Sequence, residues 1–135
     1  MYGGKRISEL KKGLSIALVS EAGMPSISDP GANLVREVRE NDLDVICIPG
    51  PCAAITALVA SGLPSSKFIF EGFLPKKKSE REKLLLAISK NDRTTILFES
   101  PYRLKNLLNE LKEYCGEKRE ILISRESTKI FEEHI

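Results

Sequence analysis

Hydrophobic and polar positions in the first half of the chain follow two patterns, one typical of buried strands and one typical of helices. Two short apolar runs, residues 15–20 and 44–48, predict buried strands. Helical spacing of apolar positions predicts helices at residues 7–14, 32–40 and 52–61. The last of these is almost wholly apolar, so we expect it to be packed on both sides. Alternating strands and helices predict a parallel sheet with right-handed crossovers.

The second half begins after a break at residues 62–66, rich in glycine, proline and serine, which we interpret as a hinge. The pattern then predicts strands at residues 67–73, 93–98 and 120–124. Helices are predicted at residues 79–89 and 101–114, the first opened by a capping box of Ser79 and Glu82. The two halves therefore predict two α/β lobes, a parallel one over residues 1–64 and a mixed-sheet one over residues 65–135.

Composition restricts the class of protein. Hydrophobic residues make up 41% of the chain and charged residues 30%, as in soluble globular proteins. The apolar stretches are too interrupted to span a membrane, and the first residues lack a signal-peptide core. Three cysteines without CxxC spacing indicate neither disulfides nor zinc and favour the cytosol. A single histidine, His134, excludes histidine-based triads and multi-histidine metal sites within one chain.

Both ends of the pattern are incomplete. The chain enters on a helix with no strand before it and leaves in the middle of a further element. A domain with only two parallel strands would expose the sheet edges and bury too little core. We therefore expect a fragment of a longer protein, shortened at both ends.

Two loops rich in small residues, 20–31 and 49–53, each follow a predicted strand and precede a predicted helix. In open parallel sheets, ligands bind outside the carboxyl ends of the strands, and small residues let a ligand approach the backbone. Neither loop matches a dinucleotide or phosphate-binding glycine motif. The loops favour a ligand such as a nucleoside, held mainly by backbone groups, although such segments also serve simply as tight turns.

The residues themselves support a specific resemblance. Residues 17–31, ALVSEAGMPSISDPG, closely resemble the strand-and-loop signature of the tetrapyrrole methylase superfamily. Within it, the match is to the branch that methylates small-subunit ribosomal RNA at a cytidine 2′-hydroxyl. Further blocks follow in the same order: PGPCAAITAL at 49–58, GLP at 62–64, EGFLP at 71–75, FESPYRL at 98–104 and RESTK at 125–129. The resemblance covers essentially the whole chain. The chain lacks the segment that corresponds to the branch's first strand.

This resemblance implies an S-adenosylmethionine-dependent methyltransferase of two α/β lobes, with the cofactor in the cleft between them. By position, the cofactor-binding residues would be Ala22, Gly23, Met24, Ile27, Cys52, Ala53, Ser100 and Ser127. Simple core packing is the alternative for Ile27 and Ala53. Glu21 and Met24 depart from the branch, which has aspartate and threonine there. We expect Gly23→Val to block the cofactor and to leave folding largely intact.

Methyl transfer from a sulfonium is an in-line displacement, and a nearby base would help a ribose hydroxyl to attack. The acidic candidates are Asp29, Glu71, Glu99 and Glu126. Glu99 and Asp29 are the candidate catalytic residues. Capping of the helix near Gly31 is the competing role for Asp29, and a solvated strand end is the alternative for Glu99. Cys52 is more plausible as a small apolar filler than as a nucleophile.

Basic residues supply candidate RNA contacts. These substrate-binding candidates are Lys76, Lys77, Lys78, Arg103 and Arg125. Counterion release makes lysine contacts to RNA favourable in free energy. An exposed helix start and local ion pairs are the alternative explanation for the same residues. The net charge of +2 is too small to indicate nucleic-acid binding by itself.

The resemblance therefore implies a ribosomal RNA methyltransferase that acts on the small ribosomal subunit as a homodimer. The residues themselves favour the cytoplasm and indicate no metal and no membrane association. Two alternatives remain open. In the first, the chain is a methyltransferase whose acceptor is a tetrapyrrole, a corrin or sirohaem precursor. In the second, the shortened chain is a non-catalytic interaction domain.

Overall fold

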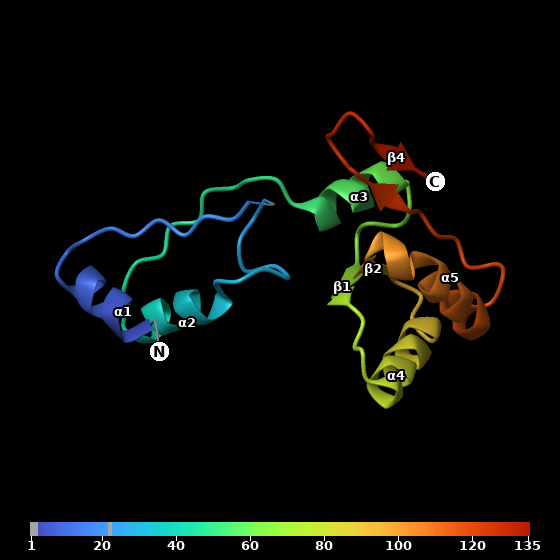
Figure 1. Ribbon diagram of the computed structural model, residues 1–135, viewed down its shortest axis with the longest axis horizontal. Coiled ribbons are helices and arrows are strands. Elements are labelled where there is room, and N and C mark those ends of the chain that lie inside the picture. The colour runs from blue at the N-terminus through green and yellow to red at the C-terminus, as the bar shows by residue number, and fades with distance from the viewer. Residues whose placement is uncertain (1–2, 22) are drawn as a thin grey trace. The chain divides into compact units, whose positions relative to one another are not determined.

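The computed structural model describes residues 3–21 and 23–135, and the chain divides into two compact units, Met1–Cys52 and Ala53–Ile135. Its elements are shown in Figure 1: α1 (Gly3–Lys11), α2 (Ala32–Glu40), α3 (Ala53–Ser61), β1 (Phe68–Phe73), α4 (Lys78–Ser89), β2 (Thr94–Phe98), α5 (Pro101–Cys115), β3 (Ser124–Arg125) and β4 (Glu133–His134). The helices and the parallel strand pair confirm the α/β class. None of the helices in the described ranges is long and apolar enough to cross a membrane.

The first unit is built on α1 and α2, which lie against each other. Ile7 of α1 and Val38 of α2 are its buried apolar side chains. The helix predicted at residues 32–40 is confirmed with the same bounds. Gly13 follows α1 with a φ of +84°, and its N–H donates to the Leu10 carbonyl at 2.9 Å, so the helix ends before residue 14, the predicted end.

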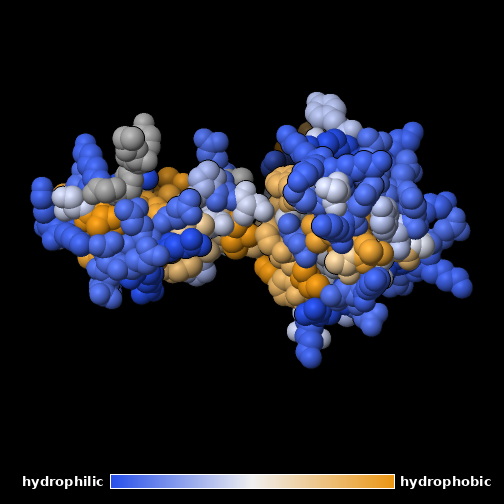
Figure 2. All heavy atoms as spheres, turned by 90° about the horizontal axis from the view of Figure 1, so that it is seen from below, coloured by the Kyte–Doolittle hydropathy of each residue, from blue (hydrophilic) through white to orange (hydrophobic). Residues whose placement is uncertain are grey.

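The two strands predicted in this unit were wrong. Residues 15–20 and 44–48 are not in any strand, and most of their apolar side chains are exposed, Val19 to 83%, Ile46 to 87% and Ile48 to 82%. Apolar surface of this kind is visible in Figure 2. A buried strand needs partner strands and covering elements. In the described part of the chain, strand pairing occurs only between residues 68 and 134, so the parallel sheet predicted for this half is absent there.

The second unit contains a β–α–β arrangement in which β1 and β2 pair in parallel and α4 connects them. The register shifts between Phe70 and Gly72, and Gly72 has a φ of +62°, which identifies a bulge. The Phe98 ring meets Phe70 and Phe73 edge to face, with ring centroids 5.2 and 5.6 Å apart. β1 and β2 thus follow the strands predicted at 67–73 and 93–98 within one residue.

The main core lies where α4 and α5 pack together, as Figure 1 shows. Its buried residues are Leu74, Leu85, Ile88 and Leu107. α5 begins with Pro101 in its first turn and ends at Gly116, whose N–H donates to the Lys112 carbonyl. The capping box was wrong, because Lys77 is the N-cap of α4 and makes no side-chain cap hydrogen bond, which leaves Ser79 inside the helix.

The remaining elements also differ from the pattern. α3 buries Ala54 and Leu58 but exposes Ile55 and Val59, so it is packed on one side and not on two. The strand predicted at 120–124 is present only at Ser124, the first residue of β3. β3 pairs with β4 in antiparallel orientation, and Ile123 and Ile135 extend this hairpin with two backbone hydrogen bonds of 2.7 and 2.9 Å. It forms a sheet separate from β1 and β2.

Candidate functional site

Two loops that are distant in sequence meet in the first unit. The Met24 N–H donates to the Pro51 carbonyl at 2.8 Å. A Cβ built on Gly50 would lie 3.6 Å from the Met24 sulfur, an ordinary contact, and would meet no other atom of the described residues within 4 Å. The loops of residues 20–31 and 49–53, predicted separately as ligand loops, are therefore held together by the backbone.

Gly23 makes this junction possible. Its φ is +107°, and a Cβ there would lie 2.4 Å from the Pro51 carbonyl oxygen. The space beside Gly23 is thus filled by the second loop, and a side chain would force the two loops apart. For this reason we now expect Gly23→Val to disturb the fold as well, contrary to the expectation from the sequence.

The first loop holds two non-glycine residues in the left-handed region, Ser26 at a φ of +73° and Ser28 at +54°. Between them, Ile27 is 44% exposed, so core packing does not account for its side chain. Gly31 is the N-cap of α2, which has no side-chain cap hydrogen bond. The capping role considered for Asp29, which is half-buried, was therefore wrong.

The other predicted cofactor residues lie in different places. Ala22 lies outside the described residues. Cys52 is half-buried and closes the first unit, whereas Ala53 is the exposed first residue of α3 in the second. Ser100 is the N-cap of α5. Ser127 follows β3, and its Oγ lies 2.8 Å from the Ser124 Oγ.

Glu99 lies at the end of β2 and is a buried carboxylate. Its side chain is 5% exposed, so a solvated strand end was the wrong interpretation. Oε1 accepts hydrogen bonds from the Ser100 N–H and the Arg103 Nε, both at 2.8 Å, and lies 2.7 Å from Arg103 Nη2. Oε2 lies 3.8 Å from Arg81 Nη2. Arg103 thus forms an ion pair, one of the two roles considered for it.

Arg81 and Glu110 complete this cluster, and our sequence reasoning did not single out either of them. Arg81 donates to both carboxylate oxygens of Glu110 at 2.6 to 3.0 Å. This hydrogen bonding raises the pKa of Arg81 and lowers the pKa of Glu110, against the opposing effect of burial. A signal was present in the sequence, because residues 81, 85 and 88 share the buried face of α4 at helical spacing.

Most of the other basic candidates are paired with acidic neighbours. Lys77 Nζ lies 2.9 Å from Glu80, and Lys78 Nζ lies 3.8 Å from Glu82. Arg125 Nη1 donates to Glu133 across the β3–β4 hairpin at 3.2 Å. Lys76 is exposed. The basic run before α4 is therefore partly neutralised by its own helix.

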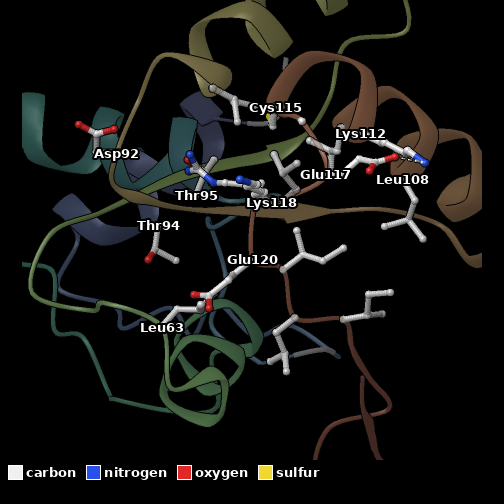
Figure 3. A pocket seen from close by; sticks show the side chains of 18 of the residues that line it. Leu63, Asp92, Thr94, Thr95, Leu108, Lys112, Cys115, Glu117, Lys118 and Glu120 are labelled. Carbon is white, nitrogen blue, oxygen red and sulfur yellow. Dashed lines mark ion pairs between the residues drawn. The ribbon is translucent and has the colours of Figure 1, made fainter.

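A groove of about 1000 Å³ lies in the second unit, seen in Figure 3. Residues of β2, the carboxyl end of α5 and the segment that follows it line the groove, and Lys112 and Glu117 form an ion pair of 2.8 Å there. Arg119 donates to the carbonyls of Asn91 and Arg93 beside β2. This groove was not predicted from the sequence, because residues 120–123, which form one of its walls, were expected to lie in a strand. Within the described residues, acidic, histidine and cysteine side chains form no cluster able to hold a metal ion.

Comparison with known proteins gives consistent matches. Residues 5–135 match the family model described as Tetrapyrrole (Corrin/Porphyrin) Methylases. The chain is 52% identical over 126 residues to a Vibrio cholerae protein named ribosomal RNA small subunit methyltransferase I, covering 93% of this chain and 44% of that protein. Proteins of the same name from Thermotoga maritima and Bacillus subtilis are 49% and 47% identical, covering 96% and 98% of this chain and 59% and 45% of theirs. The chain thus spans about half the length of these relatives.

Proposed function

Because the chain belongs to the tetrapyrrole (corrin/porphyrin) methylase family, we propose that it is part of an S-adenosylmethionine-dependent methyltransferase of small-subunit ribosomal RNA. The acceptor in this proposal is the 2′-hydroxyl of a cytidine ribose. The names of its relatives support the ribosomal RNA substrate, and the FESPYRL and EGFLP blocks support the branch.

The single observation that carries the proposal is the junction of the two loops at Met24 and Pro51. Its hydrogen bond of 2.8 Å fixes the backbone of one predicted cofactor loop against the other. Both loops consist largely of small residues, and Gly50 is open to approach on the side where a Cβ would point, apart from the Met24 thioether. A pre-formed backbone surface of this kind is suited to an uncharged nucleoside.

The backbone of these loops, rich in small residues, suits S-adenosylmethionine in the proposal. When bound, the cofactor supplies an electrophilic methyl group on a sulfonium. In the proposal, the backbone near Met24 and Gly50 holds its nucleoside, and the exposed Ile27 side chain covers it and excludes water. Cys52, Ala53, Ser100 and Ser127 remain proposed cofactor contacts. The methionine in place of threonine at position 24 would retain any contact made by its backbone.

The two candidate bases differ in their surroundings. Oε1 of Glu99 already faces three donor groups, and its other oxygen lies toward Arg81. Glu99 thus faces arginines with both of its oxygens and is suited to holding them in place. Asp29 lies half-buried in the first ligand loop and caps no helix. We therefore propose Asp29 as the group that assists deprotonation of the ribose hydroxyl.

The substrate side of the proposal includes Arg103, Arg125 and the lysines at 76–78. Arg103 is 46% exposed and held in one orientation by Glu99, which suits it to contact a phosphate. The small ribosomal subunit is the proposed partner, the cytosol the proposed compartment and a homodimer the proposed assembly. A tetrapyrrole acceptor is the second candidate, favoured by the description of the family model.

Calorimetric titration with S-adenosylhomocysteine tests the cofactor site. Tritiated methyl transfer to undermethylated small ribosomal subunits then tests the acceptor. Binding together with RNA labelling is the expected result. The absence of binding at millimolar ligand would overturn the enzyme proposal for this chain, and labelling of a porphyrinoid in place of RNA would select the second candidate.

Gly50→Val is a sharper variant than Gly23→Val for this test. Among residues 3–21 and 23–135, a Cβ at Gly50 meets only the Met24 sulfur, at 3.6 Å, so we expect the fold to tolerate it. The added methyl groups would obstruct the cofactor, and we expect affinity to fall about tenfold or more, equivalent to ~1.4 kcal/mol. Ala87→Val on the exposed face of α4 is the matched control. Equal affinities in the two variants would show that this backbone surface does not bind the ligand.

A further inference from the structure

One face of α5 exposes an aromatic ring together with amide and ammonium groups. Tyr102, Lys105, Asn106 and Asn109 occupy positions i, i+3, i+4 and i+7, which lie on the same side of a helix. All four are exposed, Tyr102 to 96%. The opposite side of α5 contributes Leu107 to the core. The position of α5 in the second unit is shown in Figure 1.

The charge of this face differs from that of the basic run before α4. Lys77 and Lys78 each have a glutamate of their own helix within 4 Å. Within residues 3–21 and 23–135, by contrast, no carboxylate forms an ion pair with Lys105, and no acidic residue lies among the four face positions. The α5 face therefore presents a positive charge that its own helix does not neutralise.

Arg103 borders this face and adds a fixed cation. Its Nε and Nη2 both contact Glu99 Oε1, at 2.8 and 2.7 Å, while 46% of the side chain is exposed. Because Glu99 is buried and also accepts from the Ser100 N–H, the guanidinium is held in place before any ligand arrives. A pre-organised arginine loses less conformational entropy on binding a phosphate.

We propose that this α5 face, Tyr102 to Asn109 with Arg103 at its border, is a contact surface for single-stranded RNA. The Tyr102 ring stacks on an unpaired base, Arg103 and Lys105 contact phosphates, and the two asparagines hydrogen-bond to base edges or ribose. The proposal rests on the proposed RNA substrate and names where the chain holds it. A protein partner is less suited, because the centres of such interfaces are apolar and poor in lysine.

The test is fluorescence anisotropy with the whole chain and a labelled oligocytidine RNA. Tyr102→Ala should weaken binding about 5- to 100-fold, the range for loss of one stacked base, and Tyr102→Phe should retain it. Lys105→Gln should lower the slope of log K against log salt by about one unit. Lys90→Gln, at the exposed C-cap of α4, is the control and should change affinity less than twofold, roughly the scatter expected for a distant charge.

Calorimetry with S-adenosylhomocysteine on the same variants separates this proposal from the methyltransferase proposal. Loss of RNA affinity in Tyr102→Ala supports the surface even if the chain binds no cofactor. If the chain binds the cofactor but Tyr102→Ala binds RNA like the parent, or if the parent binds no RNA, the surface proposal is overturned. Loss of self-association on ultracentrifugation with unchanged RNA affinity would likewise overturn it and identify a protein interface.

Discussion

Arg81 of α4 and Glu110 of α5 are joined by a bidentate ion pair across the edge of the core. The Arg81 Nε lies 2.9 and 3.0 Å from the two carboxylate oxygens, and Nη2 lies 2.6 Å from Oε2. The side chains are 18% and 32% exposed. Since the same arginine also faces Glu99, one guanidinium connects α4, the end of β2 and α5.

This pair predicts a specific loss of stability in acid. Hydrogen bonding from Arg81 lowers the folded-state pKa of Glu110 below its ordinary value of 4.5. The stabilisation is therefore fully present above that ordinary value and is lost as the pH falls through the lowered pKa. We expect Glu110→Gln to cost about 1 kcal/mol at pH 7, between the values for exposed and buried charged pairs. Urea unfolding of the parent and of Glu110→Gln, between neutral and acidic pH, measures this difference in free energy of unfolding.

Glu113→Gln is the control for this measurement, because Glu113 is exposed on the same helix. The free energies of unfolding of Glu110→Gln and the parent should converge at low pH, while Glu113→Gln should follow the parent throughout. A constant difference between Glu110→Gln and the parent at every pH would contradict a role for the charge of Glu110.

Replacement of Glu99 should lower the free energy of unfolding by more than replacement of Glu110. Replacing Glu99 with glutamine removes the charge that faces Arg103 and Arg81 from a side chain only 5% exposed. We expect Glu99→Gln to cost about 2 to 3 kcal/mol, less than a fully buried pair because Arg103 is partly exposed. A double-mutant cycle with Arg103→Gln should show coupling of at least about 0.5 kcal/mol. Additive effects in this cycle would show that the two side chains do not stabilise one another.

The sequence predicted elements well where the signal was local. α2 shows its buried face through residues 34, 35 and 38, and β1 and β2 are short apolar segments between clear turn signals. Residues 44–48 have the same apolar character but form no strand. The difference is not local, because a strand exists only where another strand pairs with it. Apolar character alone does not specify that partner.

The candidate site, too, could be predicted from the sequence only where the signal was local. Composition indicated that the two loops are rich in small residues, but not that the Met24 N–H binds the Pro51 carbonyl. It therefore did not reveal that the Pro51 carbonyl beside Gly23 also requires a small residue there. Likewise, Glu99 at a strand end was predicted to be a candidate for chemistry or solvation. Arg103 contacts it from the next turn, four residues on, but only the packing of α4 brings Arg81 to it.

Gly23 and Gly13 form a matched pair that isolates the loop junction. Both have positive φ, +107° and +84°. A Cβ at Gly13 meets no described residue within 4 Å, whereas at Gly23 it collides with the Pro51 carbonyl. Gly13→Ala should cost about 1 to 2 kcal/mol for backbone strain. Gly23→Ala should cost on the order of 1 to 3 kcal/mol more, from the collision.

Hydrogen exchange provides the structural readout for this pair. The Met24 amide, which donates to Pro51, should lose protection in Gly23→Ala and keep it in Gly13→Ala. Equal protection of Met24 in both variants would mean that the two loops do not depend on the glycine at position 23.

The exposed apolar segments predict an unusual tolerance of polar substitutions. Ile48 is 82% exposed, so Ile48→Thr removes little buried surface and should change the free energy of unfolding by less than about 0.5 kcal/mol. Leu85 is 1% exposed at the centre of the core, and Leu85→Ala should cost about 2 to 5 kcal/mol through lost burial and the cavity that it leaves. Urea unfolding of both variants measures the contrast. A cost for Ile48→Thr comparable to that of Leu85→Ala would show that residues 44–48 are buried in solution, as a paired strand would be.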